Sequence, residues 1–171
     1  GLSIHKMSEN LDSGPIYKKD FLRINKETYI NDIYSWGESK IPSMFLESLD
    51  LIKKGVKPKP QSKKFKPLRC FPRKPEDSKI DWFDNALKIN KLVRASSNPL
   101  HGAYCFTEKR EKLVIWKCLV KKVNYDFNAI PGQIIEISDN YFLVACGEQT
   151  VLLINDFNLI DNKNKKIGKK M

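Results

Sequence analysis

Residues 133–155 read QIIEISDNYFLVACGEQTVLLIN, which is three apolar runs separated by Asp139-Asn140 and by Gly147. Runs of this length and composition between turn-forming residues are typical of β-strands. Two similar runs precede them. The sequence therefore predicts five strands, over residues 104–107, 112–120, 133–137, 141–146 and 150–155. Short strands at regular intervals favour a small antiparallel barrel or sandwich, and an OB-like barrel is the most economical choice.

One helix is predicted directly upstream of these strands. Trp82, Ile89 and Val93 lie at helical spacing, with Asp81 as the expected N-cap. The helix is expected to stop at Asn98-Pro99, since a proline disfavours helical backbone in the residue before it. The apolar side chain of Trp82, like that of Trp116, is expected in the core.

The N-terminal third has a different pattern. Residues 2–24 read as a β-turn-β unit, because two extended stretches flank a turn rich in Asn, Asp and Gly. Residues 27–54 then carry apolar side chains at a helical period that is interrupted by Gly37 and Pro42. This pattern predicts two short helices or one kinked helix, ended by Gly55.

A basic, proline-rich stretch separates the two patterns. Residues 55–75 contain five prolines and little periodicity, which indicates a linker. The expected organisation is a first structural unit, a linker, a second unit that begins with the bridging helix, and a basic tail. Their boundaries are residues 1–55, 56–80, 81–158 and 159–171.

The length and charge of the chain limit its class. With 171 residues and 41% hydrophobic content, it is neither a disordered tail nor a mini-protein. The net charge of +11 is concentrated in ten cations between Lys53 and Lys74 and five lysines between Lys163 and Lys170. The rest of the chain carries 16 cations against 20 acids. The basic stretches are either solvated segments without a specific partner or binding segments for a phosphate-rich ligand.

Cysteine usage and hydropathy point to an intracellular chain. The four cysteines are widely spaced, without a CxxC pair, so neither a disulfide framework nor a metal site is expected. No secretory leader precedes the first strand, and a cytoplasmic location is expected. No apolar run approaches the roughly 20 residues of a membrane helix, so no membrane partner is expected. The start at Gly1, without methionine, suggests a fragment.

The chemistry-bearing residues are few. The sequence has no GxGxxG, GxxxxGK[ST] or GxSxG motif, so dinucleotide, P-loop and hydrolase readings find no support. Asp12 stands in an Asp-Ser-Gly turn close to His5. A partly desolvated carboxylate there could orient or accept protons, although most such turns only bond their own backbone. His101 stands at the helix exit and is expected to pack or to bond backbone.

Several segments, taken together, resemble the formyltransferase family that uses 10-formyltetrahydrofolate. They occur in the family's order and read GLSIHKM with LDSGPI (residues 1–7 and 11–16), RKPEDSKIDW (73–82), PLHGAY (99–104), and IPGQII with VACG (130–135 and 144–147). The resemblance implies an α/β plus β fold. The chain would be the C-terminal portion of a Rossmann-like formyltransferase domain, linked to a small OB-like antiparallel β-barrel.

The resemblance also implies a catalytic trio of Asn, His and Asp, and 10-formyltetrahydrofolate as cofactor. Asp12 matches the third member, but the sequence contains no Asn-x-His, so the other two cannot be assigned. His5 fits the strand before the turn and is expected to pack or to line the substrate pocket. The 171 residues alone are therefore expected to be inactive, with the folate bound mainly by residues upstream.

Two substrate classes remain open within the family. Residues 69–78 look closer to formyltransferases of nucleotide-linked 4-amino sugars, such as UDP-4-amino-4-deoxy-L-arabinose, with Arg73 and Arg94 as candidate substrate-binding residues. The basic linker 53–74 instead favours methionyl-tRNA formyltransferases, since tRNA binding depends on phosphate neutralisation. A non-enzymatic binding module is the third alternative. The oligomeric state does not follow from the sequence.

Overall fold

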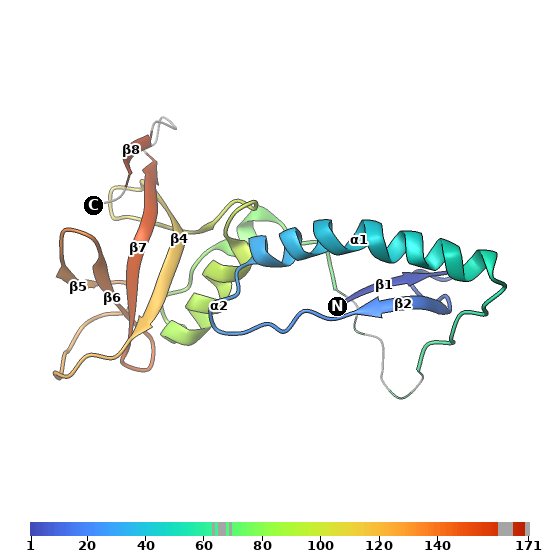
Figure 1. The fold of residues 1–171 in the computed structure, drawn as a ribbon. Coiled ribbons are helices and arrows are strands. Elements are labelled where there is room, and N and C mark those ends of the chain that lie inside the picture. Colours follow the sequence, from blue (N-terminus) through green and yellow to red (C-terminus); the bar gives the residue numbers. More distant parts are fainter. Residues whose placement is uncertain (63, 65–67, 69, 161–165, 170–171) are drawn as a thin grey trace. The chain divides into compact units, whose positions relative to one another are not determined.

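The computed structural model describes residues 1–62, 64, 68, 70–160 and 166–169. The chain divides into two compact units (Figure 1), which we call unit 1 (Gly1–Pro72) and unit 2 (Arg73–Met171). Each unit is described by itself.

Unit 1 is a β-hairpin covered by one long helix. Strands β1 (Leu2–His5) and β2 (Ile16–Asp20) pair antiparallel, and α1 (Ile30–Lys53) runs along them (Figure 1). Two ion pairs join the hairpin to the helix, Lys18 with Glu47 and Lys40 with Asp20. The predicted β-turn-β unit and the helical segment after it are both present.

The helix α1 is continuous through Gly37 and Pro42, where the sequence left two short helices as an alternative. The Asp32 carboxylate in its first turn accepts the backbone N–H of Tyr29, which satisfies one of the unpaired donors at the helix start. The helix ends at Lys53, close to the predicted end at Gly55. Gly55 has a φ of 71°, in the left-handed region that glycine adopts readily and that ends a helix.

Unit 2 is an antiparallel sheet covered by a short helix. Its elements are η1 (Pro75–Ser78), α2 (Ala86–Ser96), β3 (Ala103–Phe106), β4 (Lys112–Lys121), β5 (Ile134–Ile137), β6 (Phe142–Cys146), β7 (Thr150–Ile160) and β8 (Lys166–Lys169). The strand order is β3-β4-β7-β6-β5, and β8 also pairs with β7. In the part of the chain that the structure describes, no pairing joins β3 to β5. The sheet is therefore open, and the closed OB-like barrel is not confirmed.

The core of unit 2 lies between α2 and the sheet. Ala86, Ile89 and Val93 of α2 are almost fully buried, at the spacing that places them on one face of the helix. They pack with buried side chains of the sheet that include Ile115 and Leu152. The five strands predicted from the sequence all form, with ends shifted by a few residues.

The N-cap of α2 was predicted wrongly. The cap is Asn85, whose side chain accepts the backbone N–H of Lys88 at 3.0 Å. Asp81 caps the preceding turn instead, since its carboxylate accepts the N–H of Phe83 at 3.0 Å. Both residues have side chains suited to capping, and the hydrophobic pattern alone did not distinguish them.

The segment that leads into α2 is bonded to the sheet at several points. The Ile80 N–H donates to the Tyr104 carbonyl at 2.7 Å. The Gly147 N–H contacts the carbonyl oxygens of Trp82 (2.9 Å) and Asp84 (3.0 Å). These bonds hold residues 80–84 against β3 and against the turn between β6 and β7.

The boundary between the units, after Pro72, lies inside the stretch predicted as a linker. The first part of that stretch belongs to unit 1, where Ile16 and Lys59 exchange two backbone hydrogen bonds. Its last part carries η1 and belongs to unit 2. In the predicted basic tail, β7 extends to Ile160 and β8 begins at Lys166, while residues 161–165 and 170–171 lie outside the described residues.

Candidate functional site

The loop between β1 and β2 carries Asp12, the sequence-based candidate for catalysis. Its φ is 53°, in the left-handed region that aspartate tolerates better than most residues. The side chain is 81% exposed. The loop therefore presents the carboxylate outward rather than using it in the core.

This loop is held in place by close backbone contacts. A Cβ at Gly14 would lie 1.6 Å from the carbonyl oxygen of Lys6, so no other residue fits there without a change of backbone. The Lys6 N–H donates to the Pro15 carbonyl at 2.9 Å. Gln61 adds two bonds, because its Nε2 donates to the carbonyl oxygens of Asp12 (2.6 Å) and Gly14 (2.9 Å).

The sequence did not indicate Gln61 as a site residue. It lies 49 residues after Asp12, in a proline-rich stretch without periodicity. No local sequence pattern links the two positions. In the structure, the pairing of Lys59 with Ile16 places this stretch beside the hairpin.

His5 and Asp12 lie close to each other in the hairpin. The His5 Nε2 and the Asp12 Oδ1 are 3.7 Å apart, which is within ion-pair range but too long for a hydrogen bond. The other ring nitrogen, Nδ1, is 3.0 Å from the Lys6 carbonyl oxygen, which can only accept, so Nδ1 carries a proton.

Arg73 and Arg94, the candidate substrate ligands, lie in unit 2 and take part in bonds within it. The Arg73 guanidinium donates to the hydroxyls of Ser78 (3.2 Å) and Ser96 (3.1 Å), which joins η1 to the end of α2. The Arg94 Nε donates to the Asn90 side chain at 3.0 Å. A substrate-binding role for either arginine stays a prediction.

The basic linker 53–74 is only partly visible. Lys53, Lys54, Lys57, Lys59 and Lys64 have exposed side chains. Three further cations of the stretch, at positions 63, 66 and 69, lie outside the described residues.

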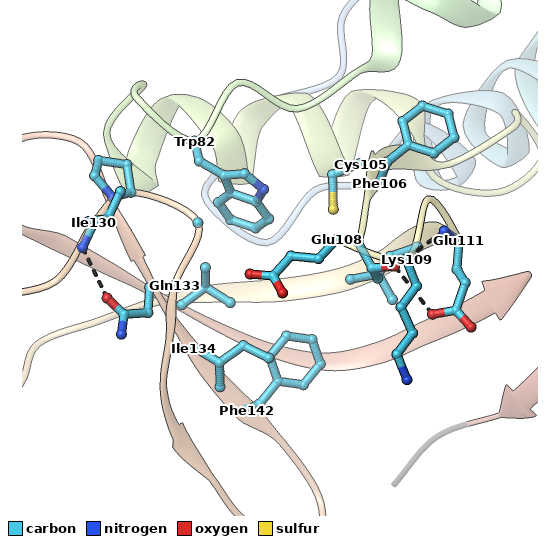
Figure 2. Close-up of a pocket in the computed structure, with 15 residues that line it drawn as sticks. Trp82, Cys105, Phe106, Glu108, Lys109, Glu111, Ile130, Gln133, Ile134 and Phe142 are labelled. Carbon is cyan, nitrogen blue, oxygen red and sulfur yellow. Dashed lines mark hydrogen bonds between the residues drawn. The ribbon is translucent and has the colours of Figure 1, made fainter.

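A second candidate site is a pocket of about 850 Å³ within unit 2 (Figure 2). Its lining comes from the end of β3, the 107–111 turn and residues 130–134, with Trp82 at one side and Phe142 among its apolar residues. Sequence reasoning assigned Trp82 to the core. The indole does pack against the core, but it also lines this pocket.

The buried thiols of unit 2 are poor nucleophiles. Burial raises the pKa of Cys105 to about 11 and the pKa values of Cys118 and Cys146 to about 12. Because the reactive form is the thiolate, the Cys105 thiol that lines the pocket stays protonated near neutral pH.

Across the described ranges, no helix has the length and hydropathy needed to cross a bilayer. In the same ranges, no three side chains of His, Cys, Asp or Glu converge as a metal site would require. Cytoplasmic location stays a prediction.

Known proteins resemble both units. Residues 73–168 match the family described as formyl transferase, C-terminal domain. The methionyl-tRNA formyltransferase of Carboxydothermus hydrogenoformans is 32% identical over 155 residues, which cover 90% of this chain and 49% of that protein. The chain therefore spans about half the length of this relative.

Solved structures of HypX from Aquifex aeolicus share the fold. HypX in complex with tetrahydrofolic acid has a TM-score of 0.65 at 17% identity, covering 96% of this chain and 28% of that one. A multiply substituted HypX variant gives a TM-score of 0.66 at the same identity and the same coverage of both chains. At this identity, the likeness concerns the fold alone.

Proposed function

The chain belongs to the formyl transferase family, and from that premise we propose that it takes part in transferring a formyl group from 10-formyltetrahydrofolate to the amine of a nucleotide-linked 4-amino sugar. The family match over residues 73–168 carries the formyltransferase part of this proposal. The sugar acceptor rests on the sequence of residues 69–78, which is similar to that branch of the family.

Asp12 is the residue of this chain to which we assign a catalytic role. Its carboxylate would orient an imidazole and stabilise the imidazolium that forms as the attacking amine loses its proton. The bonds from Gln61 and the close approach at Gly14 would fix the backbone that carries the Asp12 side chain, and a well-placed backbone helps to orient such a group.

We propose that the folate is bound mainly by residues outside these 171. The Asp12 carboxylate lies at an exposed edge of the hairpin, so unit 1 supplies one wall of a site and we derive no step through the folate. The Asn-x-His pattern is absent from these 171 residues. We therefore propose that the 171 residues are inactive when isolated.

The exposed surface of α1 supports the assignment of unit 1 to a larger catalytic domain. Tyr34, Ile41, Phe45, Leu49 and Ile52 are each between 37% and 52% exposed, and their spacing aligns them along one side of the helix. We name these five residues the α1 stripe. Since exposed apolar surface of this kind marks an interaction site, we propose that the stripe packs against the rest of the catalytic domain.

A second acceptor, methionyl-tRNA, is favoured by two observations. One is that the relative with 32% sequence identity is a methionyl-tRNA formyltransferase. The other is the row of exposed lysines at positions 53, 54, 57 and 59, which would neutralise phosphates of a polyanion. The bonds of Arg73 within unit 2 also weaken the case for that residue as a diphosphate ligand.

An activity assay separates the acceptors. The polypeptide extended to the length of its relatives would be incubated with 10-formyltetrahydrofolate and, in separate reactions, UDP-4-amino-4-deoxy-L-arabinose and methionyl-tRNA. Formylation of the sugar supports our first choice, and formylation of the tRNA alone replaces it with the second. If neither acceptor is formylated, both proposed substrates are wrong.

The same assay tests Asp12. We expect Asp12→Asn to lower kcat by about a hundredfold or more, because the amide keeps the shape but loses the charge that stabilises the imidazolium. Asp139→Asn is the matched control, since Asp139 is an exposed aspartate in the turn between β5 and β6. Full activity of Asp12→Asn would remove the catalytic role that we assign to it.

A further inference from the structure

We propose that the pocket of unit 2 binds a small organic cation, an ammonium group carried on an apolar carbon chain. This inference does not rest on the proposed formyl transfer, because the pocket lies within unit 2 and contains neither Asp12 nor His5. Its volume, about 850 Å³, is in the range of small-molecule sites.

The aromatic walls of the pocket are held in place before any ligand arrives. Gly132 packs against Trp82, since a Cβ at Gly132 would lie 3.0 Å from the indole Cδ1. The Trp82 indole N–H donates to the Cys105 sulfur. Phe142 is held edge-to-face by Phe157, with ring centroids 5.1 Å apart. A preformed aromatic surface loses little conformational entropy on binding.

One of the two carboxylates that line the pocket belongs to Glu108. Figure 2 shows its side chain pointing into the pocket, toward the space between Trp82 and Phe142. Within the described residues, the Glu108 carboxylate has neither a hydrogen bond nor an ion pair. An aromatic face beside a carboxylate attracts a cation through both the ring quadrupole and the formal charge.

The remaining charges favour the same ligand. Glu111 also lines the pocket, and its carboxylate accepts a hydrogen bond from the Thr107 hydroxyl at 3.2 Å. The Lys109 side chain is directed away from Trp82 (Figure 2). Two carboxylates against one ammonium disfavour a phosphate, so a nucleotide or tRNA backbone is a poor occupant.

The apolar part of the ligand has its own contacts. Leu113, Ile134 and Val144 line the pocket together with Phe142. The chain itself shows the proposed interaction nearby, because the Lys112 ammonium lies 4.1 Å from the centroid of the Tyr104 ring. An alkylammonium would satisfy both the apolar and the charged parts of the lining.

The test is a titration of the ¹⁵N-labelled 171-residue chain with hexyltrimethylammonium, followed by NMR. We expect saturable shifts of the Trp82 indole N–H and of the Ile134 amide. 1-Hexanol and hexanoate are the neutral and anionic controls, and both should bind more weakly than the cation. Shifts centred outside the pocket, no saturation, or equal binding of hexanol would overturn the proposal.

The variant Glu108→Gln separates charge from hydrophobic binding. It should weaken hexyltrimethylammonium binding roughly threefold to tenfold and leave hexanol binding unchanged. Because Glu108 is exposed and has no described partner, the fold should not change, which the unshifted amides elsewhere would show. Glu76→Gln, at an exposed glutamate in η1, should not alter the affinity. Equal affinity of Glu108→Gln and the original chain would refute the role of the carboxylate.

Discussion

Unit 2 buries a cluster of thirteen side chains between α2 and the sheet, whereas the described part of unit 1 has only Ile16 and Met44 as buried apolar side chains larger than alanine. Unit 1 instead leaves the α1 stripe exposed. Because burial of apolar surface is the main force that stabilises a fold, the two units differ in how far each supports itself. The difference predicts that unit 2 folds alone, and it supports our proposal that unit 1 belongs to a larger domain.

Separating the units gives the largest expected effect. Residues 73–171 expressed alone should unfold in one cooperative transition in urea, because their core is complete. Residues 1–72 alone should show no cooperative transition, because two buried side chains cannot offset the entropy of ordering the chain. Far-UV circular dichroism against urea concentration measures both. A cooperative transition of residues 1–72 would show that unit 1 also folds alone, and the proposed difference between the units would be wrong.

Alkaline pH should destabilise unit 2 through its buried thiols. Burial raises the pKa of Cys118 and of Cys146 to about 12, above the value near 8.5 of an unfolded thiol. The stability that these thiols support is fully present below about pH 8.5 and is lost as pH rises toward 12. The loss is at most about 1.4 kcal/mol per thiol and pH unit.

Urea unfolding of residues 73–171 at pH 8 and pH 10.5 measures this loss. Cys118→Val should reduce the pH dependence, since valine packs in the core without titrating. In the full chain, Cys70→Ser should leave the dependence unchanged, because Cys70 is exposed. An equal pH dependence in Cys118→Val would exclude that thiol as a contributor.

Shortening a side chain in unit 2 should lower the free energy of unfolding more at a buried position than at an exposed one. Leu152→Ala, at a fully buried position of β7, should lower the free energy of unfolding by about 3 kcal/mol. Leu119→Ala, at a leucine of β4 that is 57% exposed, should cost less than about 1 kcal/mol. Urea unfolding of both variants gives the comparison. Similar costs at the two positions would show that the buried cluster does not dominate stability.

The smallest expected effect lies in unit 1. Gly37→Ala should stabilise α1 by about 1 kcal/mol, because alanine is the better helix former and a Cβ there would meet no atom within 4 Å. Gly14→Ala should act in the opposite direction, since its Cβ would collide with the Lys6 carbonyl. Amide hydrogen exchange of α1 and of the hairpin measures the two effects separately. Slower exchange of the hairpin in Gly14→Ala would contradict the described contact.

Local pattern was enough to predict most elements of both units. Alternation and turn residues located the five strands from β3 to β7, and helical spacing located α1 and α2. The bounds were less well predicted, because several residues near a helix start have side chains that can cap it. Asp81 and Asn85 are four residues apart, and only the packing of Ala86 against the sheet decides between them.

The candidate sites depend on contacts that no local pattern encodes. Asp12 and His5 are only seven residues apart in one hairpin, whereas the bond from Gln61 to Asp12 spans 49 residues. The pocket of unit 2 combines Trp82 with residues 105–109 and 130–134, which lie more than 20 residues apart in the sequence and meet only in the folded unit. β8 was also missed, because four residues rich in lysine resemble a solvated tail.

The bonds that hold residues 80–84 to the sheet also have a mechanical consequence. A pulling force applied to the chain from the side of Pro72 enters unit 2 through Arg73, which is bonded to Ser96, and then reaches the bond between Ile80 and Tyr104. The Gly147 N–H, bonded to Trp82 and Asp84, carries the load that remains. Tension is thus borne first by hydrogen bonds at the rim of unit 2, including the one to the C-terminal residue of α2, before it reaches the buried core.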